Sequence, residues 1–110
     1  MGMKHALEQA GFEVRVAHDG EECLRMAMED VPDLPLLDIM MPKMDGIDVL
    51  KRLRADDRTR GLSVVMCSAK DFKTEREVAA EFGAAGYFVK SSNPDELVVM
   101  VRDVFGLQHG

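Results

Sequence analysis

The sequence predicts an α/β fold in which helices cover both faces of a parallel sheet. Short apolar runs rich in β-branched residues alternate with longer stretches of helical periodicity, a pattern typical of βαβ units. Two of the apolar runs are almost continuous, as expected for strands that are buried on both faces of a sheet. The chain has 110 residues. This is the length of one compact domain, so we expect a single domain over residues 1–110.

Four strands are predicted from the apolar runs. They cover residues 12–17, 34–38, 62–67 and 86–90. The first run alternates apolar and charged residues, which is typical of a strand near the edge of a sheet. Pro35 cannot donate a ladder hydrogen bond, so we expect it at the start of a strand, at a bulge or on an edge strand.

Five helices are predicted between and around these strands. Residues 4–10 form the end of a helix, and residues 20–29 and 45–55 carry apolar side chains at helical spacing. A fourth helix, marked by residues 76–82, stops at Gly83. The last helix follows Asn93, a capping residue, and has Pro94 at its first position. Helices and strands therefore alternate along the whole chain, with a helix at each end.

The composition excludes several classes of protein. The net charge of −6 and the pI near 5.0 argue against direct binding to nucleic acid. No apolar stretch reaches the ~20 residues of a membrane span, and the first residues do not resemble a signal peptide, so we expect a cytoplasmic protein. Cys23 and Cys67 are far apart and lack metal-ligand spacing, which predicts two reduced thiols in apolar positions.

Three polar residues lie where predicted strands end. Asp38 closes the second strand, Ser68 follows the third, and Lys90 closes the fourth. The carboxyl ends of parallel strands meet at one edge of a sheet, where such folds bind ligands. A carboxylate, a hydroxyl and an ammonium group there could form a phosphoryl site. Taken singly, such an Asp is more often a helix cap or turn former, such a Ser usually satisfies a loop, and such a Lys usually extends into water.

The run LLDIMMPKMDGIDVLKRLR, from Leu36 to Arg54, resembles the signature of response-regulator receiver domains. VAHDGEECL, SAK and GYFVK resemble further segments of that family, so the similarity extends over essentially the whole chain. The resemblance implies a flavodoxin-like, doubly wound parallel sheet with the strand order 2-1-3-4-5. The family's first strand is missing here, which predicts four strands with five helices.

The resemblance also implies a role for individual residues. Asp38 would take a phosphoryl group from a histidine kinase or a phosphotransfer protein, and the backbone carbonyl of Met40 would bind Mg²⁺ together with Asp38. Lys90 and Ser68 would contact phosphoryl oxygens. Tyr87 would turn inward when Ser68 is recruited, although a strand aromatic with its hydroxyl in water fits the sequence equally well. The chain would then be a signalling module that acts on a downstream effector protein, not an enzyme.

This chain departs from the family pattern at the metal site. The acidic pair that ends the family's first strand is absent, so Asp38 and one carbonyl should bind Mg²⁺ weakly or not at all. Asp19, Asp45 and Asp48 are expected in turns and in the first turn of a helix, not as substitutes. Ser91 and Ser92 follow Lys90 where the family usually has a proline, which leaves the loop that directs Lys90 less rigid.

Two alternatives to a phosphorylated receiver remain open. A pseudo-receiver or truncated receiver would keep the fold and act as a protein-interaction module without magnesium-dependent phosphorylation. A flavin protein or hydrolase on a similar fold would need a GxSxG elbow or a Gly-rich phosphate loop, and neither follows a predicted strand. Because the missing strand is internal, its loss should leave a gap between residues 12–17 and 34–38. We expect that gap to favour a homodimer over closure into a four-stranded sheet.

Overall fold

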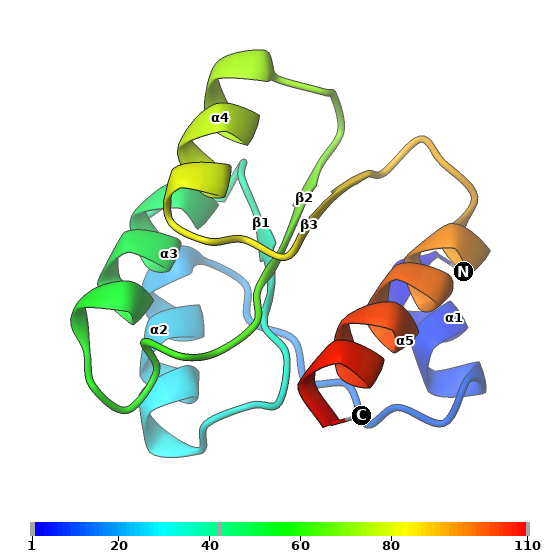
Figure 1. The fold of residues 1–110 in the computed structure, drawn as a ribbon, viewed down its shortest axis with the longest axis horizontal. Coiled ribbons are helices and arrows are strands. Elements are labelled where there is room, and N and C mark those ends of the chain that lie inside the picture. The colour runs from blue at the N-terminus through cyan, green and yellow to red at the C-terminus, as the bar shows by residue number, and fades with distance from the viewer. Residues whose placement is uncertain (1, 42, 110) are drawn as a thin grey trace.

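The structure, a computed structural model, describes residues 2–41 and 43–109. Over these residues the chain forms five helices and three strands (Figure 1). The helices are α1 (Met3–Gln9), α2 (Gly20–Glu29), α3 (Gly46–Ala55), α4 (Lys73–Glu81) and α5 (Pro94–His109), and the strands are β1 (Leu36–Asp38), β2 (Val65–Ser68) and β3 (Gly86–Val89).

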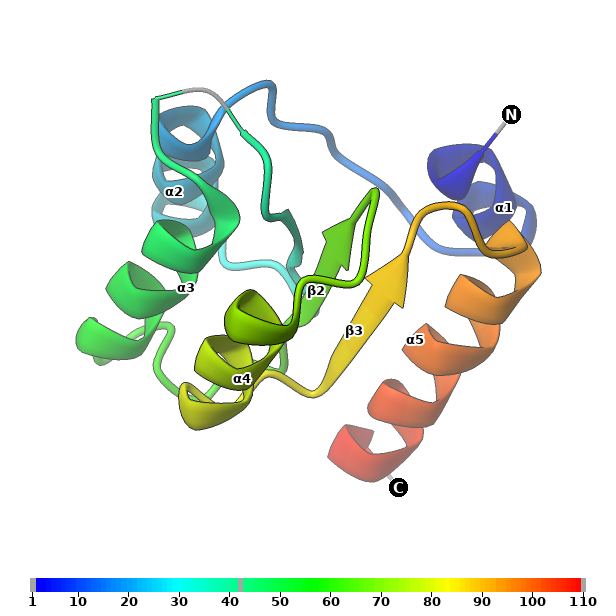
Figure 2. The same cartoon turned by 90° about the horizontal axis from the view of Figure 1, so that it is seen from above.

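The elements form three layers. Helices α1 and α5 pack together on one face of the sheet, and α2, α3 and α4 cover the other (Figure 1, Figure 2). Side chains of the central strand alternate between the two cores. Val65 and Cys67 pack with α1 and α5, whereas Met66 packs with the opposite group of helices. This alternation confirms the α/β fold with a sheet buried on both faces.

All three strands are parallel, in the order β1-β2-β3. Asp38 lies opposite Cys67, and Ser68 lies opposite Val89. The register therefore brings the last residues of the strands to one edge of the sheet. The main functional hypothesis depends on this placement.

The strand expected over residues 12–17 does not form, so the described part of the chain has three strands, not four. Parallel strands are held by hydrogen bonds to a neighbour, and no backbone hydrogen bond links residues 12–17 to another strand within the described residues. The segment is still anchored through its side chains. Phe12 and Val14 pack against the core beneath α1 and α5, and the rings of Phe12 and Phe105 lie 5.5 Å apart.

The prediction for Pro35 is confirmed. Strand β1 begins one residue after Pro35, whose carbonyl accepts a hydrogen bond of 3.1 Å from the Val65 N–H. The proline thus stands at the start of a strand that has no neighbour on its other side among the described residues. Its missing N–H breaks no ladder bond there.

Local capping signals also correspond to the observed helix starts. The Asp19 carboxylate accepts a hydrogen bond of 2.8 Å from the Glu22 N–H at the start of α2. The Asn93 side chain accepts one of 2.9 Å from the Asp95 N–H, and Pro94 is the first residue of α5. These contacts satisfy backbone donors that the helices leave unpaired.

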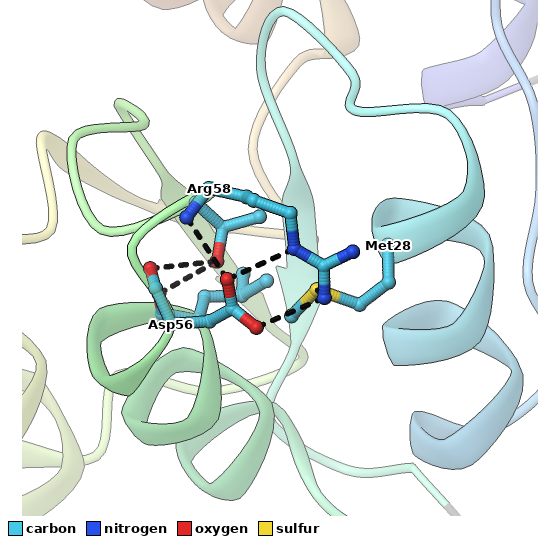
Figure 3. Close-up of polar contacts among 5 residues, drawn as sticks. Met28, Asp56 and Arg58 are labelled. Atoms are coloured by element: carbon cyan, nitrogen blue, oxygen red, sulfur yellow. Dashed lines mark hydrogen bonds and ion pairs between the residues drawn. The ribbon is translucent and has the colours of Figure 1, made fainter.

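An arginine fastens the loop that follows α3 to the end of α2 (Figure 3). The Arg58 guanidinium donates to both carboxylate oxygens of Asp56, at 3.1 and 3.0 Å, and to the sulfur of Met28 at 3.3 Å. The Arg58 hydrogen bonds hold the pKa of Asp56 below its usual value. The contact with Met28 links this loop to α2.

Candidate functional site

The three strand-end residues come together at the carboxyl edge of the sheet. The Lys90 ammonium forms an ion pair with the Asp38 carboxylate, and the Lys90 N–H donates to the Ser68 carbonyl at 2.7 Å. The side chains of Asp38 and Lys90 are 29% and 34% exposed, so an incoming group can reach them from solvent. The carboxylate and the cation thus meet at the edge where the sequence placed them, and Ser68 ends the neighbouring strand.

Close backbone contacts position the end of β1. The Met40 N–H donates a hydrogen bond of 2.9 Å to the Asp38 carboxylate. A side chain at Gly46 would place its Cβ 2.4 Å from the Asp38 carbonyl oxygen, and one at Gly20 would lie 1.8 Å from the Met44 carbonyl oxygen. Only glycine allows both approaches, so these two glycines fix how closely α2 and α3 approach the loop after Asp38. Pro42, in the same loop, lies outside the described residues.

Ser68 lies buried at the end of β2. Its hydroxyl oxygen accepts a hydrogen bond of 3.3 Å from the Lys70 N–H. A hydroxyl that accepts one bond still has its own proton to donate. Ser68 can therefore remain attached to the loop while it donates to an oxygen near Asp38.

Tyr87 directs its hydroxyl toward the loop after β2. The hydroxyl donates to the Lys70 carbonyl at 3.0 Å and accepts from the Phe72 N–H at 3.3 Å. The Arg76 guanidinium lies 4.8 Å from the centre of the Tyr87 ring. The sequence left two orientations open, and in the structure the hydroxyl is hydrogen-bonded to the loop after β2. The sequence did not predict the contact between Arg76 and Tyr87, because no sequence motif distinguishes Arg76 from other arginines on helices.

Cys67 lies directly before Ser68 and is buried. Burial raises the pKa of its thiol to about 12, with a smaller opposing effect from Lys90 and a reinforcing one from Asp38. The thiol is therefore neutral at physiological pH and contributes to the core. Cys23 is also free, and burial raises the pKa of its thiol. Both observations agree with the predicted apolar thiols.

The residues around Asp38 fit a bound Mg²⁺ poorly. Across the described residues, no group of three or more His, Cys, Asp or Glu side chains converges on one point. Asp19 and Asp45 cap helices α2 and α3, and the Glu22 N–H lowers the pKa of Asp19. Mg²⁺ prefers six oxygen ligands in near-octahedral geometry, and here Asp38 already pairs with a cation.

A groove of about 560 Å³ separates residues 12–17 from β1 and reaches Asp38 at one end. The two flanking segments have therefore not closed into a continuous sheet. Apolar side chains from both segments line the groove, among them Val14, Val16, Leu34 and Leu36. Strand β1 has no strand neighbour on this side among the described residues.

Comparison with known proteins identifies the family. The response regulator receiver domain family matches residues 1–102, so the chain belongs to that family. Solved receiver domains have the same fold, which confirms the flavodoxin-like assignment. The chemotaxis protein CheY4 of Vibrio cholerae superposes with a TM-score of 0.84 at 30% identity, over 92% of this chain and 84% of that chain. Response regulators of this family are signalling proteins.

Two curated relatives are transcriptional regulators. The chain is 43% identical to transcriptional regulatory protein CpxR of Escherichia coli over 97% of its own length and 44% of the relative. It is 37% identical to the alkaline phosphatase synthesis transcriptional regulatory protein PhoP of Bacillus subtilis, over 93% of its length and 42% of the relative. The chain thus spans less than half of these relatives.

Another solved structure of a receiver domain contains a metal ion. The receiver domain of the sensor histidine kinase PA1611 from Pseudomonas aeruginosa has a magnesium ion coordinated in its active-site cleft. It superposes with a TM-score of 0.78 at 25% identity, over 90% of this chain and 82% of that chain. Receiver domains generally bind Mg²⁺ in the active site. None of the described helices is long and apolar enough to cross a bilayer.

Proposed function

We propose that residues 1–110 are a receiver domain that accepts a phosphoryl group on Asp38 from a histidine kinase or a phosphotransfer protein. The observation that carries this proposal is the convergence of Asp38, Ser68 and Lys90 at the carboxyl edge of the sheet. We further propose that the protein works in the cytoplasm and signals to a downstream effector protein, without contacting nucleic acid itself.

The chemistry assigned to these residues is an in-line displacement. One Asp38 carboxylate oxygen attacks the phosphorus of a phosphohistidine, the P–N bond breaks, and its electron pair returns to the imidazole. Phosphoryl transfer depends mainly on positioning and charge neutralisation. Lys90 supplies the neutralising charge, and Ser68 donates its hydroxyl proton to a phosphoryl oxygen. The Met40 N–H holds the carboxylate in place before the attack.

A pseudo-receiver is the second candidate, and the scarcity of metal ligands around Asp38 favours it. In this form the fold would serve as a protein-interaction module and Asp38 would remain unmodified. The Asp38–Lys90 ion pair would then be structural.

Mapping of the modified residue tests both candidates. The protein is incubated with acetyl phosphate and Mg²⁺, and the product is analysed by mass spectrometry. We expect one added phosphoryl group on Asp38 and none on Asp38→Asn. Asp48→Asn is the matched control, because Asp48 is an exposed helix residue, and it should be modified like the wild type. Full modification of Asp38→Asn would refute the assignment, and an unmodified wild type would favour the pseudo-receiver.

A further inference from the structure

We infer that Arg76 is a positioning residue for the phosphoryl site, because it latches Tyr87 and the loop after β2 in place. The inference rests on the proposed function of Asp38 and Ser68. Arg76 lies on the first turns of α4 and does not touch Asp38, Ser68 or Lys90 in any described contact. It acts through Tyr87 and through Asp71.

The first half of the latch is a two-pronged ion pair. The Arg76 Nε donates to one carboxylate oxygen of Asp71 at 3.0 Å, and Nη2 donates to the other at 3.1 Å. Asp71 belongs to the loop between β2 and α4, so this pair ties the loop to the helix that follows it. Such parallel geometry fixes the orientation of a guanidinium more firmly than a single contact does.

The second half is the contact with the aromatic ring. The same guanidinium lies 4.8 Å from the centre of the Tyr87 ring, within the range of a cation–π interaction. Tyr87 comes from β3, on the other side of the loop from α4. Arg76 therefore covers the ring while the hydroxyl of Tyr87 bonds to Lys70 and Phe72. One side chain thus holds three chain segments together.

The latch reaches the phosphoryl site through Lys70. The Lys70 carbonyl accepts a hydrogen bond from the Tyr87 hydroxyl, and the Lys70 N–H donates one to the Ser68 hydroxyl oxygen. When Tyr87 swings away, the peptide groups on both sides of Lys70 lose a neighbour that restrains them. The hydrogen bond from the Lys70 N–H to the Ser68 hydroxyl oxygen is then held less firmly.

The latch is weak enough to open during signalling. The Arg76 and Asp71 side chains are 50% and 56% exposed, so water and salt screen their attraction. A cation–π contact at an exposed site shifts a two-state equilibrium by about two- to fivefold. The latch therefore biases the loop toward the observed conformation without locking it.

Two readouts report on the latch without any phosphorylation. Tyr87 is the only tyrosine and the chain has no tryptophan, so quenching of its intrinsic fluorescence by acrylamide measures the exposure of that one ring. Amide hydrogen exchange at Lys70 and Phe72 measures the hydrogen bonds that these N–H groups donate to the hydroxyls of Ser68 and Tyr87. In Arg76→Ala we expect stronger quenching, and exchange at both amides about two- to fivefold faster. Added salt should accelerate exchange in the wild type more than in the variant.

Matched variants separate the latch from general destabilisation. Arg25→Ala removes another exposed arginine with a helix ion pair and should leave both readouts unchanged. Arg76→Lys keeps the charge but loses the two-pronged pair, and Asp71→Asn keeps the ring contact, so each should give an intermediate effect. Equal exchange at Lys70 and Phe72 in Arg76→Ala and Arg25→Ala would overturn the inference. Failure of Asp38 phosphorylation alone would overturn only the proposed function.

Discussion

Asp38 and Lys90 are 52 positions apart in the chain, yet their side chains meet. Asp38 ends β1 and Lys90 directly follows β3, and the carboxyl ends of parallel strands lie at a common edge of the sheet. The position of a strand-end residue could therefore be predicted from the sequence, because the parallel register leaves it few alternative positions. Cys67, one position before Ser68, packs with α1 and α5, and both residues are buried.

We expect Cys67 to resist thiol reagents in the native protein. The thiolate is the reactive species, and burial raises the pKa of Cys67 to about 12. In Cys23→Ser only Cys67 remains, and its labelling should occur only through unfolding, roughly 10³-fold or more slower than labelling in denaturant. A disulfide reagent with a chromophoric leaving group measures both rates. Similar rates in native and denatured protein would contradict the buried position.

The raised pKa of the Cys67 thiol also makes the stability of the fold depend on pH. The unfolded thiol ionises near its ordinary value of 9.0, whereas the folded thiol keeps its proton up to about 12. Stability from Cys67 is therefore complete below pH 9.0 and falls as the pH rises from there to about 12, because the unfolded state loses the proton first. Cys67→Ala should show a smaller decline in urea midpoint over that range.

Among the elements, the helices were easier to predict than the first strand. Asp19, Asn93 and Pro94 are local signals, and each lies at a helix start as expected. A strand depends instead on a partner that lies elsewhere in the chain. Residues 12–17 carry a strand-like pattern but find no backbone partner in the described structure, so the pattern alone gave the wrong element. Tertiary contacts of Arg58 and Arg76 were also beyond local signals.

In our interpretation, metal binding depends on a strand that would fill the groove between residues 12–17 and β1. We expect Mg²⁺ to bind this chain weakly, because no group of three or more His, Cys, Asp or Glu side chains converges on one point among the described residues. Joining an apolar strand that ends in two aspartates ahead of α1 should fill the groove and raise the affinity on the order of tenfold or more. Isothermal titration calorimetry measures the change.

The control for that experiment is the same strand ending in two asparagines. It would fill the groove equally well but would add no charge near Asp38, so the affinity should rise much less. Equal affinities for the original chain and the aspartate version would show that other residues complete the site.

At the scale of the whole molecule, an apolar groove lies along one edge of the sheet. β1 and β3 are the two edge strands of the described sheet, and a groove of about 560 Å³ lies between β1 and residues 12–17. Val16, which lines this groove, is 49% exposed, so a large apolar side chain faces solvent there. An open strand edge beside apolar side chains favours pairing with another strand.

We therefore expect the protein to self-associate through this groove. A second copy could pair its own β1 edge here and bury Val14, Val16 and Leu36 from water, whereas closing the groove within one molecule would require close-packed helices to shift. Light scattering across a dilution series should show a mass that rises with concentration. Val16→Lys places a charge in the groove and should give a monomer. Val99→Lys changes a valine of similar exposure on α5, outside the groove, and should behave like the wild type. A monomer at every concentration, with well-dispersed amide signals, would show instead that the isolated chain tolerates its open edge.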